Sequence, residues 1–240
     1  MIADWREAAF YVWLKVCMNR LIKLSSYQID GLKTYHGTTT VGLKCLDGIV
    51  FATDTRVTAG FYIAHRSGKK MCEIDKHLAM TIAGSVADAH NVVDILRYHA
   101  NLYRLERRMP IPVKTAARLT ANILFSSRMF PLIADVLIGG YDSSGPSVFN
   151  IDLFGSLSNG KFLSTGSGSP VAYGILESEY KESLTVSKAV NIAVKAILAA
   201  IKRNIGTGDS FDVATIDKSG FRELSTQEKE KISSQISRRI

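Results

Sequence analysis

The hydrophobic pattern changes its period along the chain, from the short runs and alternation of β-strands to the three- and four-residue spacing of helices. It predicts strands over residues 38–45, 49–55, 71–83 (with a break near Asp75-Lys76), 134–140, 147–154, 161–165 and 211–216. It predicts helices from Ser85 to the stop at Pro110, over residues 113–125, from Pro170, and from a cap at Thr185. The polar tail after Ser225 is predicted to be an exposed helix.

The order of these elements is strands, two helices, strands, two helices, strand. Helices grouped in pairs between antiparallel strands are typical of a layered α+β domain rather than a doubly wound parallel sheet. No internal repeat, low-complexity stretch or linker follows residue 38.

The first two strands are joined by a segment that ends in Asp47-Gly48, a strong signal for a hairpin turn. A two-residue turn there places Asp54 opposite Val41. Thr38 and Val41 then face opposite sides of the sheet, so a bulge or bend is needed to bring Asp54 towards Thr38.

The chain has 240 residues, enough for one large domain with a dispensable segment, and a net charge of +8. Its Lys and Arg residues are scattered, without the basic run or aromatic stripe expected for nucleic-acid or membrane binding. Cys17, Cys45 and Cys72 form no CxxC pair and are interpreted as small, buried, reduced thiols of a cytosolic protein. The five histidines show no metal-binding spacing, and neither a metal nor a cofactor is expected.

Residues 1–37 are a candidate pro-segment. The apolar run in residues 8–14 is too short to span a bilayer, and the acidic residues near its start argue against a signal peptide. Apolar positions in residues 5–21 instead suggest a short amphipathic helix. We interpret this segment as one that blocks Thr38 until it is removed; the alternative is an ordinary N-terminal helix.

The sequence Gly37-Thr38 is the candidate cleavage site and nucleophile. A threonine hydroxyl inside a chain has no base of its own. Cutting the Gly37-Thr38 bond frees an α-amine with a pKa of about 7.7–8.0, next to that hydroxyl. One residue then supplies both the nucleophile and the general base of a peptidase.

Several motifs, in order, resemble a proteasome β subunit of the archaeal type over residues 37–217. They are Gly37-Thr38-Thr39-Thr40-Val41-Gly42, Ala52-Thr53-Asp54-Thr55-Arg56, Lys69-Lys70, Ala83-Gly84-Ser85-Val86-Ala87-Asp88, Thr165-Gly166-Ser167-Gly168-Ser169 and Gly206-Thr207-Gly208. The resemblance implies a four-layer αββα sandwich of the N-terminal-nucleophile hydrolase type. It also implies self-cleavage before Thr38 and a catalytic domain over residues 38–240. It implies seven-membered β rings stacked with α subunits and other β subunits, a regulatory ATPase acting through the α ring, and unfolded polypeptides as substrates.

The resemblance also assigns roles to single residues. Lys70 lies beside Thr38 and lowers the pKa of neighbouring groups, while Asp54 pairs with Lys70 and orients it. Gly84 donates its backbone N–H to the oxyanion, and Ser167 orders the threonine amine. A phosphate-binding reading of the Gly-Ser loop is disfavoured because the loop lacks the lysine of a P-loop.

One position departs from the family pattern. Asn204 stands where an aspartate is usual, and Thr207 stands where serine is common. An amide keeps an oxygen acceptor but loses the charge and gains donors, which suggests a slow or specialised subunit. The residues implied to form the substrate pocket are small or apolar, which predicts cleavage after apolar residues. They are Val57, Thr58, Gly68, Cys72, Ile82 and Val86.

Two other functions remain open from the sequence. Asn204 favours a non-catalytic β subunit that supports active neighbours in the ring, whereas Thr38, Asp54 and Lys70 argue for a catalytic one. The other is a different N-terminal-nucleophile hydrolase, either the bacterial two-component peptidase or a small-molecule amidase.

Overall fold

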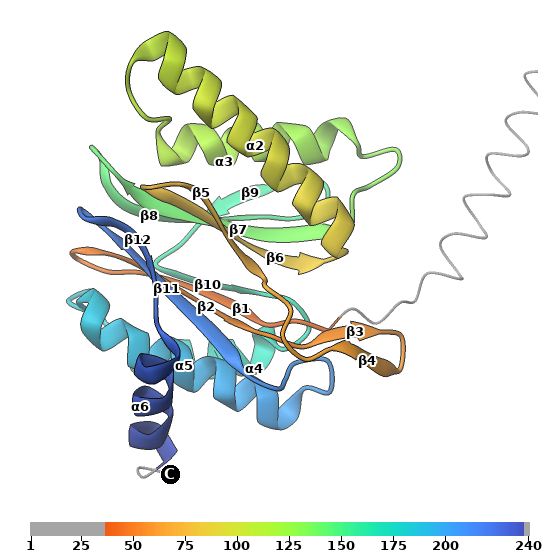
Figure 1. The fold of residues 1–240 in the computed structure, drawn as a ribbon, viewed down its shortest axis with the longest axis vertical. Helices are drawn as coiled ribbons and strands as arrows, with labels where there is room; N and C mark the ends of the chain where they lie inside the picture. Colours follow the sequence, from red (N-terminus) through yellow and green to blue (C-terminus); the bar gives the residue numbers. More distant parts are fainter. Residues whose placement is uncertain (1–36, 238–240) are drawn as a thin grey trace, which may run out of the picture. The chain divides into compact units, whose positions relative to one another are not determined.

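The structure, a computed structural model, describes residues 37–237, in which two antiparallel five-stranded sheets lie face to face (Figure 1). The first sheet has the order β10 (Phe162–Thr165), β1 (Thr40–Lys44), β2 (Gly48–Asp54), β11 (Phe211–Asp217) and β12 (Gly220–Glu223). The second has the order β5 (Met71–Asp75), β6 (Leu78–Gly84), β7 (Ala134–Asp142), β8 (Gly145–Ile151) and β9 (Leu157–Asn159). A separate hairpin consists of β3 (Val57–Ala59) and β4 (Tyr62–His65).

Helices cover the outer faces of both sheets. On the second sheet lie α2 (Val86–Arg107) and α3 (Val113–Ser126), and on the first lie α4 (Ser169–Glu179) and α5 (Val186–Arg203). The last helix, α6 (Thr226–Ser237), packs against α5. The predicted α+β class and the αββα layer order are therefore confirmed.

Strand β2 shows how the sequence specifies the central layers. All seven of its residues are buried, because both faces of the strand are covered. Ile49 and Phe51 face the core between the sheets, and Val50 and Ala52 face the core beneath α4 and α5. A strand buried on both faces has a continuous apolar sequence rather than an alternating one.

The β1–β2 hairpin corrects the predicted register. Lys44 pairs with Ile49 and the Cys45 N–H donates to the Gly48 carbonyl at 2.8 Å, so the two-residue turn lies at Leu46-Asp47 rather than at Asp47-Gly48. Asp54 then lies beside Thr39 instead of Val41, and its N–H donates to the Thr39 carbonyl at 3.1 Å. No bulge is needed, since a turn one residue earlier shifts Asp54 by two positions towards the start of β1.

Asp47 has a role that the turn signal did not reveal. Thr185 occupies the N-cap position of α5, as predicted, but its side chain makes no capping hydrogen bond. The Asp47 carboxylate instead accepts the Val186 N–H at 2.8 Å. A carboxylate at a helix N-terminus satisfies an unpaired donor and complements the helix dipole.

The other predicted elements are present with boundaries shifted by a few residues, except that the strand predicted to 154 ends at Ile151. Strands β3, β4, β9 and β12 were not predicted. Residues 1–36 of the predicted pro-segment, with the amphipathic helix in it, lie outside the described residues. Within residues 37–237, no helix is long and apolar enough to cross a membrane.

Candidate active site

Thr38 lies at the start of the first sheet and is 4% exposed. Its hydroxyl donates to the carbonyl oxygen of the preceding residue, Gly37, at 2.6 Å. The Gly37 N–H donates to the Thr58 hydroxyl at 2.9 Å. A Cβ on Gly37 would collide with the backbone of Gly206, so only glycine fits here without a shift. These contacts hold the candidate nucleophile against the carbonyl group that precedes it.

Ser167 connects Thr38 to the loop after α5. Its hydroxyl accepts the Thr38 N–H at 3.4 Å and donates to Asn204 Oδ1 at 2.9 Å. The next N–H, of Gly168, donates to the Thr38 carbonyl at 3.3 Å. Gly166, with φ of +87°, provides the left-handed backbone that this approach requires. The Gly-Ser loop therefore folds around Thr38, as the family resemblance implied.

The side chain of Asn204 uses both ends of its amide. Its Oδ1 accepts from Ser167 Oγ, from Gly206 N–H at 3.1 Å and from Thr207 Oγ1 at 2.9 Å. Its Nδ2 donates to the Ser167 carbonyl at 3.1 Å. The backbone N–H and the backbone carbonyl fix which end is oxygen and which is nitrogen. An unprotonated aspartate would place lone pairs against the Ser167 carbonyl.

Thr207 extends this network to the first strand. Its hydroxyl lies 2.7 Å from the Thr39 hydroxyl. Since a hydroxyl has one proton, and Thr207 donates to Asn204, Thr39 is the donor in this pair. The structure thus brings Thr38, Ser167, Asn204 and Thr207 together, although they are far apart in the sequence.

Asp54 and Lys70 form a buried ion pair next to this network. Asp54 is 0% exposed and Lys70 5%, and Lys70 Nζ donates to Asp54 Oδ1 at 2.8 Å. Three backbone N–H groups also donate to the Asp54 carboxylate: Thr39 and Gly208, each at 2.9 Å, and Arg56 at 3.2 Å. Burial lowers the pKa of Lys70 from its usual value, and Asp54 opposes that effect.

The ion pair joins the two sheets. Asp54 ends β2 in the first sheet, whereas Lys70 immediately precedes β5 in the second, where its carbonyl accepts the Ile82 N–H at 2.9 Å. The neighbouring lysine differs: Lys69 pairs with Glu223 at 2.9 Å, and the two side chains are 63% and 34% exposed. Lys70 is therefore part of the buried site, whereas Lys69 lies at the surface.

Gly84 is the last residue of β6, just before the start of α2. Its φ is +114°, and a Cβ there would collide with the Ile133 carbonyl, so the position requires glycine. Along a strand, N–H groups two residues apart point the same way. The Ile82 N–H points towards Lys70, and the Gly84 N–H therefore points to the same side, beyond the start of β5. This direction suits the Gly84 N–H as an oxyanion donor in the pocket that it shares with Thr38.

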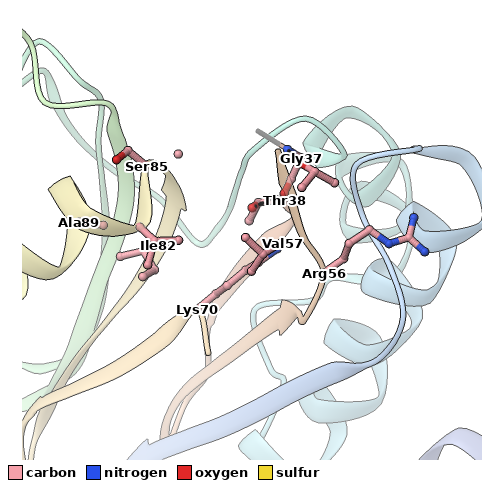
Figure 2. Close-up of a pocket in the computed structure, with 11 residues that line it drawn as sticks. Gly37, Thr38, Arg56, Val57, Lys70, Ile82, Ser85 and Ala89 are labelled. Atoms are coloured by element: carbon pink, nitrogen blue, oxygen red, sulfur yellow. Dashed lines mark hydrogen bonds between the residues drawn. The ribbon is translucent and has the colours of Figure 1, made fainter. Parts of the chain in front are cut away.

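A pocket opens between Thr38 and the start of α2. Figure 2 shows Thr38 and Val57 on one side and Ile82, Ser85 and Ala89 on the other. The lining residues are Gly37, Thr38, Arg56, Val57, Thr58, Lys70, Ile82, Gly84, Ser85, Val86 and Ala89. Of these, Arg56, Ser85 and Ala89 were missed, although the three-residue spacing of Val86 and Ala89 on one helix face was a usable signal.

Two residues predicted to line the pocket do not. Gly68 lies behind Val57, because a Cβ on Gly68 would collide with the Val57 side chain. Cys72 is 7% exposed and belongs to the core beneath α2, where burial raises the pKa of its thiol. Neither residue is therefore among those that line the pocket.

Comparisons with known proteins find one matching family and several close relatives of this chain. The family model described as "Proteasome subunit" matches residues 34–216. "Proteasome subunit beta 2" of Nitrosopumilus maritimus is 52% identical over 200 residues, which cover 83% of this chain and 95% of the relative. The protein of the same name from Cenarchaeum symbiosum is 52% identical over 199 residues, 83% of this chain and 94% of the relative. "Proteasome subunit beta" of Methanothermobacter thermautotrophicus is 47% identical over 199 residues, 82% of this chain and 95% of the relative.

The two adjacent lysines provide a matched test of the buried ion pair. Lys70→Met keeps the aliphatic stem but leaves the Asp54 carboxylate buried without its cation, so we expect the free energy of unfolding to fall by about 3–5 kcal/mol. Lys69→Met removes an exposed pair and should cost less than about 1 kcal/mol. Urea unfolding of the full-length chain measures both. Equal losses in the two variants would contradict a special role for Lys70.

Proposed function

We propose, because this chain belongs to the proteasome family and is a β subunit of its core particle, that Thr38 is its catalytic nucleophile once the Gly37-Thr38 bond is cut. Proteasome β subunits are a family of threonine endopeptidases, and most of this chain matches them. The observation that carries the proposal is the buried Thr38, with its hydroxyl on the Gly37 carbonyl and Ser167 and Lys70 lining its surroundings.

Self-cleavage would begin with attack of the Thr38 hydroxyl oxygen on the Gly37 carbonyl carbon. The acyl group moves from the Thr38 nitrogen to its oxygen, and the hydroxyl proton ends on the nitrogen, so an ester replaces the amide. Water then hydrolyses the ester and releases residues 1–37. The freed amine and the hydroxyl of Thr38 become the base and the nucleophile for later substrates.

Peptide hydrolysis would use the same groups. The Thr38 amine accepts the hydroxyl proton, and the hydroxyl oxygen attacks the substrate carbonyl carbon. The peptide C–N bond then breaks, the departing amine takes that proton, and water hydrolyses the acyl-enzyme ester. Ser167, held by Asn204, orients the amine. The Lys70 cation favours the deprotonated hydroxyl, and the Gly84 N–H stabilises the oxyanion. Neither a metal nor a cofactor enters this scheme.

The pocket and the family together suggest the substrates and partners. Val57, Ile82, Val86 and Ala89 give the pocket a mainly apolar lining, which suits an apolar side chain on the acyl side of the cleaved bond. In the proposed particle, seven-membered β rings stack with rings of α subunits around a cytoplasmic chamber. A regulatory ATPase acting through the α ring would deliver unfolded polypeptides to it.

A non-catalytic β subunit is the second candidate, because Asn204 stands where an aspartate is usual. Against it, the Asn204 amide makes four hydrogen bonds that keep Ser167 and Thr207 in place around Thr38. The experiments below separate the two functions.

Self-cleavage is tested by the intact mass of the subunit after co-assembly with its α partner. We expect the chain as given to lose residues 1–37, and the Thr38→Ala variant to retain them, because the attacking hydroxyl is gone. A mixed assembly of the variant with active subunits controls for cutting by neighbours. An uncut chain in assembled rings would favour the non-catalytic candidate.

Cleavage preference is tested with fluorogenic peptides that carry leucine, arginine or glutamate before the cleaved bond. We expect the leucine peptide to react at least about tenfold faster, because the apolar pocket gains binding energy from burying it. The Thr38→Ala particle, which should cleave none of them, controls for contaminating peptidases. Faster cleavage after arginine would contradict the apolar pocket.

Asn204→Asp tests the missing charge. A carboxylate near Thr38 favours the protonated amine and raises its pKa, so we expect the acid limb of the pH–rate profile to move up by as much as about one pH unit. Asn191→Asp adds the same charge to an exposed position of α5 and should leave the profile in place. An unshifted profile for Asn204→Asp would show that the amine does not sense this position.

A further inference from the structure

The loop of residues 204–210, between α5 and β11, carries two of the groups that surround Thr38 but has little apolar packing of its own. Ile205, its one large apolar side chain, is 93% exposed. Asn204 and Thr207 nevertheless keep hydrogen-bond distances of 2.7–2.9 Å to Ser167 and Thr39. A segment with few buried apolar contacts opens easily unless polar interactions hold it.

Asp209 provides such an interaction. Its carboxylate is bound by two arginines: Arg56 reaches both oxygens, with Nε to Oδ2 at 3.0 Å and Nη2 to Oδ1 at 3.3 Å, and Arg66 Nη1 reaches Oδ1 at 2.8 Å. The Asp209 side chain is 15% exposed and that of Arg56 20%. Hydrogen bonds from Arg56, the largest influence, hold the pKa of Asp209 below its usual value, so the carboxylate is charged at neutral pH.

Arg56 also holds the other end of the loop. Its Nη1 donates to the Ile205 carbonyl at 2.9 Å, and its guanidinium packs directly on Gly208, where a Cβ would collide with it. One planar guanidinium thus spans the loop from Ile205 to Asp209. Bidentate arginine–carboxylate contacts fix geometry as well as adding energy.

The backbone at Asp209 supports a specific role. Its φ is +63°, and only one other non-glycine residue among those described, Arg108, has a positive φ. The left-handed conformation is unfavourable for most side chains, but Asp and Asn tolerate it. This conformation accompanies the placement of the carboxylate between the two arginines.

The two arginines come from the segments that follow β2 and β4. The loop also bonds the first of these segments through Gly208, which contacts Asp54 and Arg56. Arg56 lies two residues after Asp54, and Arg66 follows β4, whose hairpin partner β3 contributes Val57 and Thr58 to the pocket. The Asp209 carboxylate therefore ties the loop to the end of β2 and to the hairpin on the substrate side.

We propose that Asp209 is a positioning residue for catalysis: bound by Arg56 and Arg66, it fixes the 204–210 loop so that Asn204 and Thr207 hold Ser167 and Thr39 around the nucleophile. The inference rests on the proposed function. Because Asp209 does not itself line the pocket and holds the loop whose side chains orient Thr38, its removal lowers kcat far more than it changes KM.

Asp209→Asn isolates the charge, since asparagine accepts the left-handed conformation. In the full-length chain assembled with its α partner, we expect kcat for a fluorogenic peptide to fall about tenfold while KM stays within about twofold. Asp212→Asn is the matched control: Asp212 is a 17% exposed carboxylate three residues away, paired with Lys229 at 2.8 Å. It should leave kcat within about twofold of the parent.

Arg66→Glu keeps the test decisive if Asp209→Asn fails to assemble. The Arg66 side chain is 74% exposed, so its replacement should not prevent folding, and the new carboxylate repels Asp209. We expect kcat to fall in this variant too. An unchanged kcat in Asp209→Asn, or in Arg66→Glu where the first does not assemble, would overturn the inference, as would an equal loss in Asp212→Asn. Inactivity of the parent chain itself would instead count against the proposed function.

Discussion

The buried ion pair between Asp54 and Lys70 is the interaction on which the rest of the site depends. Taking two charges out of water costs several kcal/mol per ion unless the pair is close and its remaining lone pairs are satisfied. Here the separation is 2.8 Å, and three backbone N–H groups complete the carboxylate. Since Asp54 belongs to one sheet and Lys70 to the other, this local requirement also fixes how the two sheets meet beside Thr38.

The other parts of the site are arranged around that carboxylate. Its Oδ1 holds Thr39, the residue after the nucleophile, and its Oδ2 holds Gly208 in the loop after α5. The same loop begins at Asn204, whose side-chain oxygen accepts from the Ser167 hydroxyl. Ser167 in turn accepts the Thr38 N–H. Thr38 is thus enclosed by a ring of polar contacts from four chain segments, and each contact restricts the next. Such a preorganised arrangement reduces the reorganisation needed during reaction.

The sequence predicted the layers well, and the site only in part. Buried runs such as residues 49–52 and the helical spacing in α5 identify their elements because period and burial follow directly from packing. The β3–β4 hairpin escaped prediction because Tyr62, the start of β4, is 66% exposed and the short strands bury no regular face. The predicted β1–β2 register was wrong because the Cys45 N–H bonds the Gly48 carbonyl and places the turn one residue before the Asp-Gly pair, which composition does not reveal. Gly68 and Cys72 were predicted to line the pocket but do not. Closeness in sequence to pocket residues does not distinguish a residue on the pocket surface from one packed in the core nearby.

The neutral side chain of Asn204 is consistent with the balance of the other charges in the site. Asp54 is matched by Lys70, and Asp209 by two arginines, so both carboxylates are compensated. Asn204 is the C-cap of α5, where the helix dipole disfavours an anion, and its Nδ2 faces a carbonyl that an anion would repel. A neutral amide satisfies both constraints while its oxygen still gathers Ser167, Gly206 and Thr207. The amide at position 204 therefore provides the hydrogen bonds that position these groups without adding an unpaired charge.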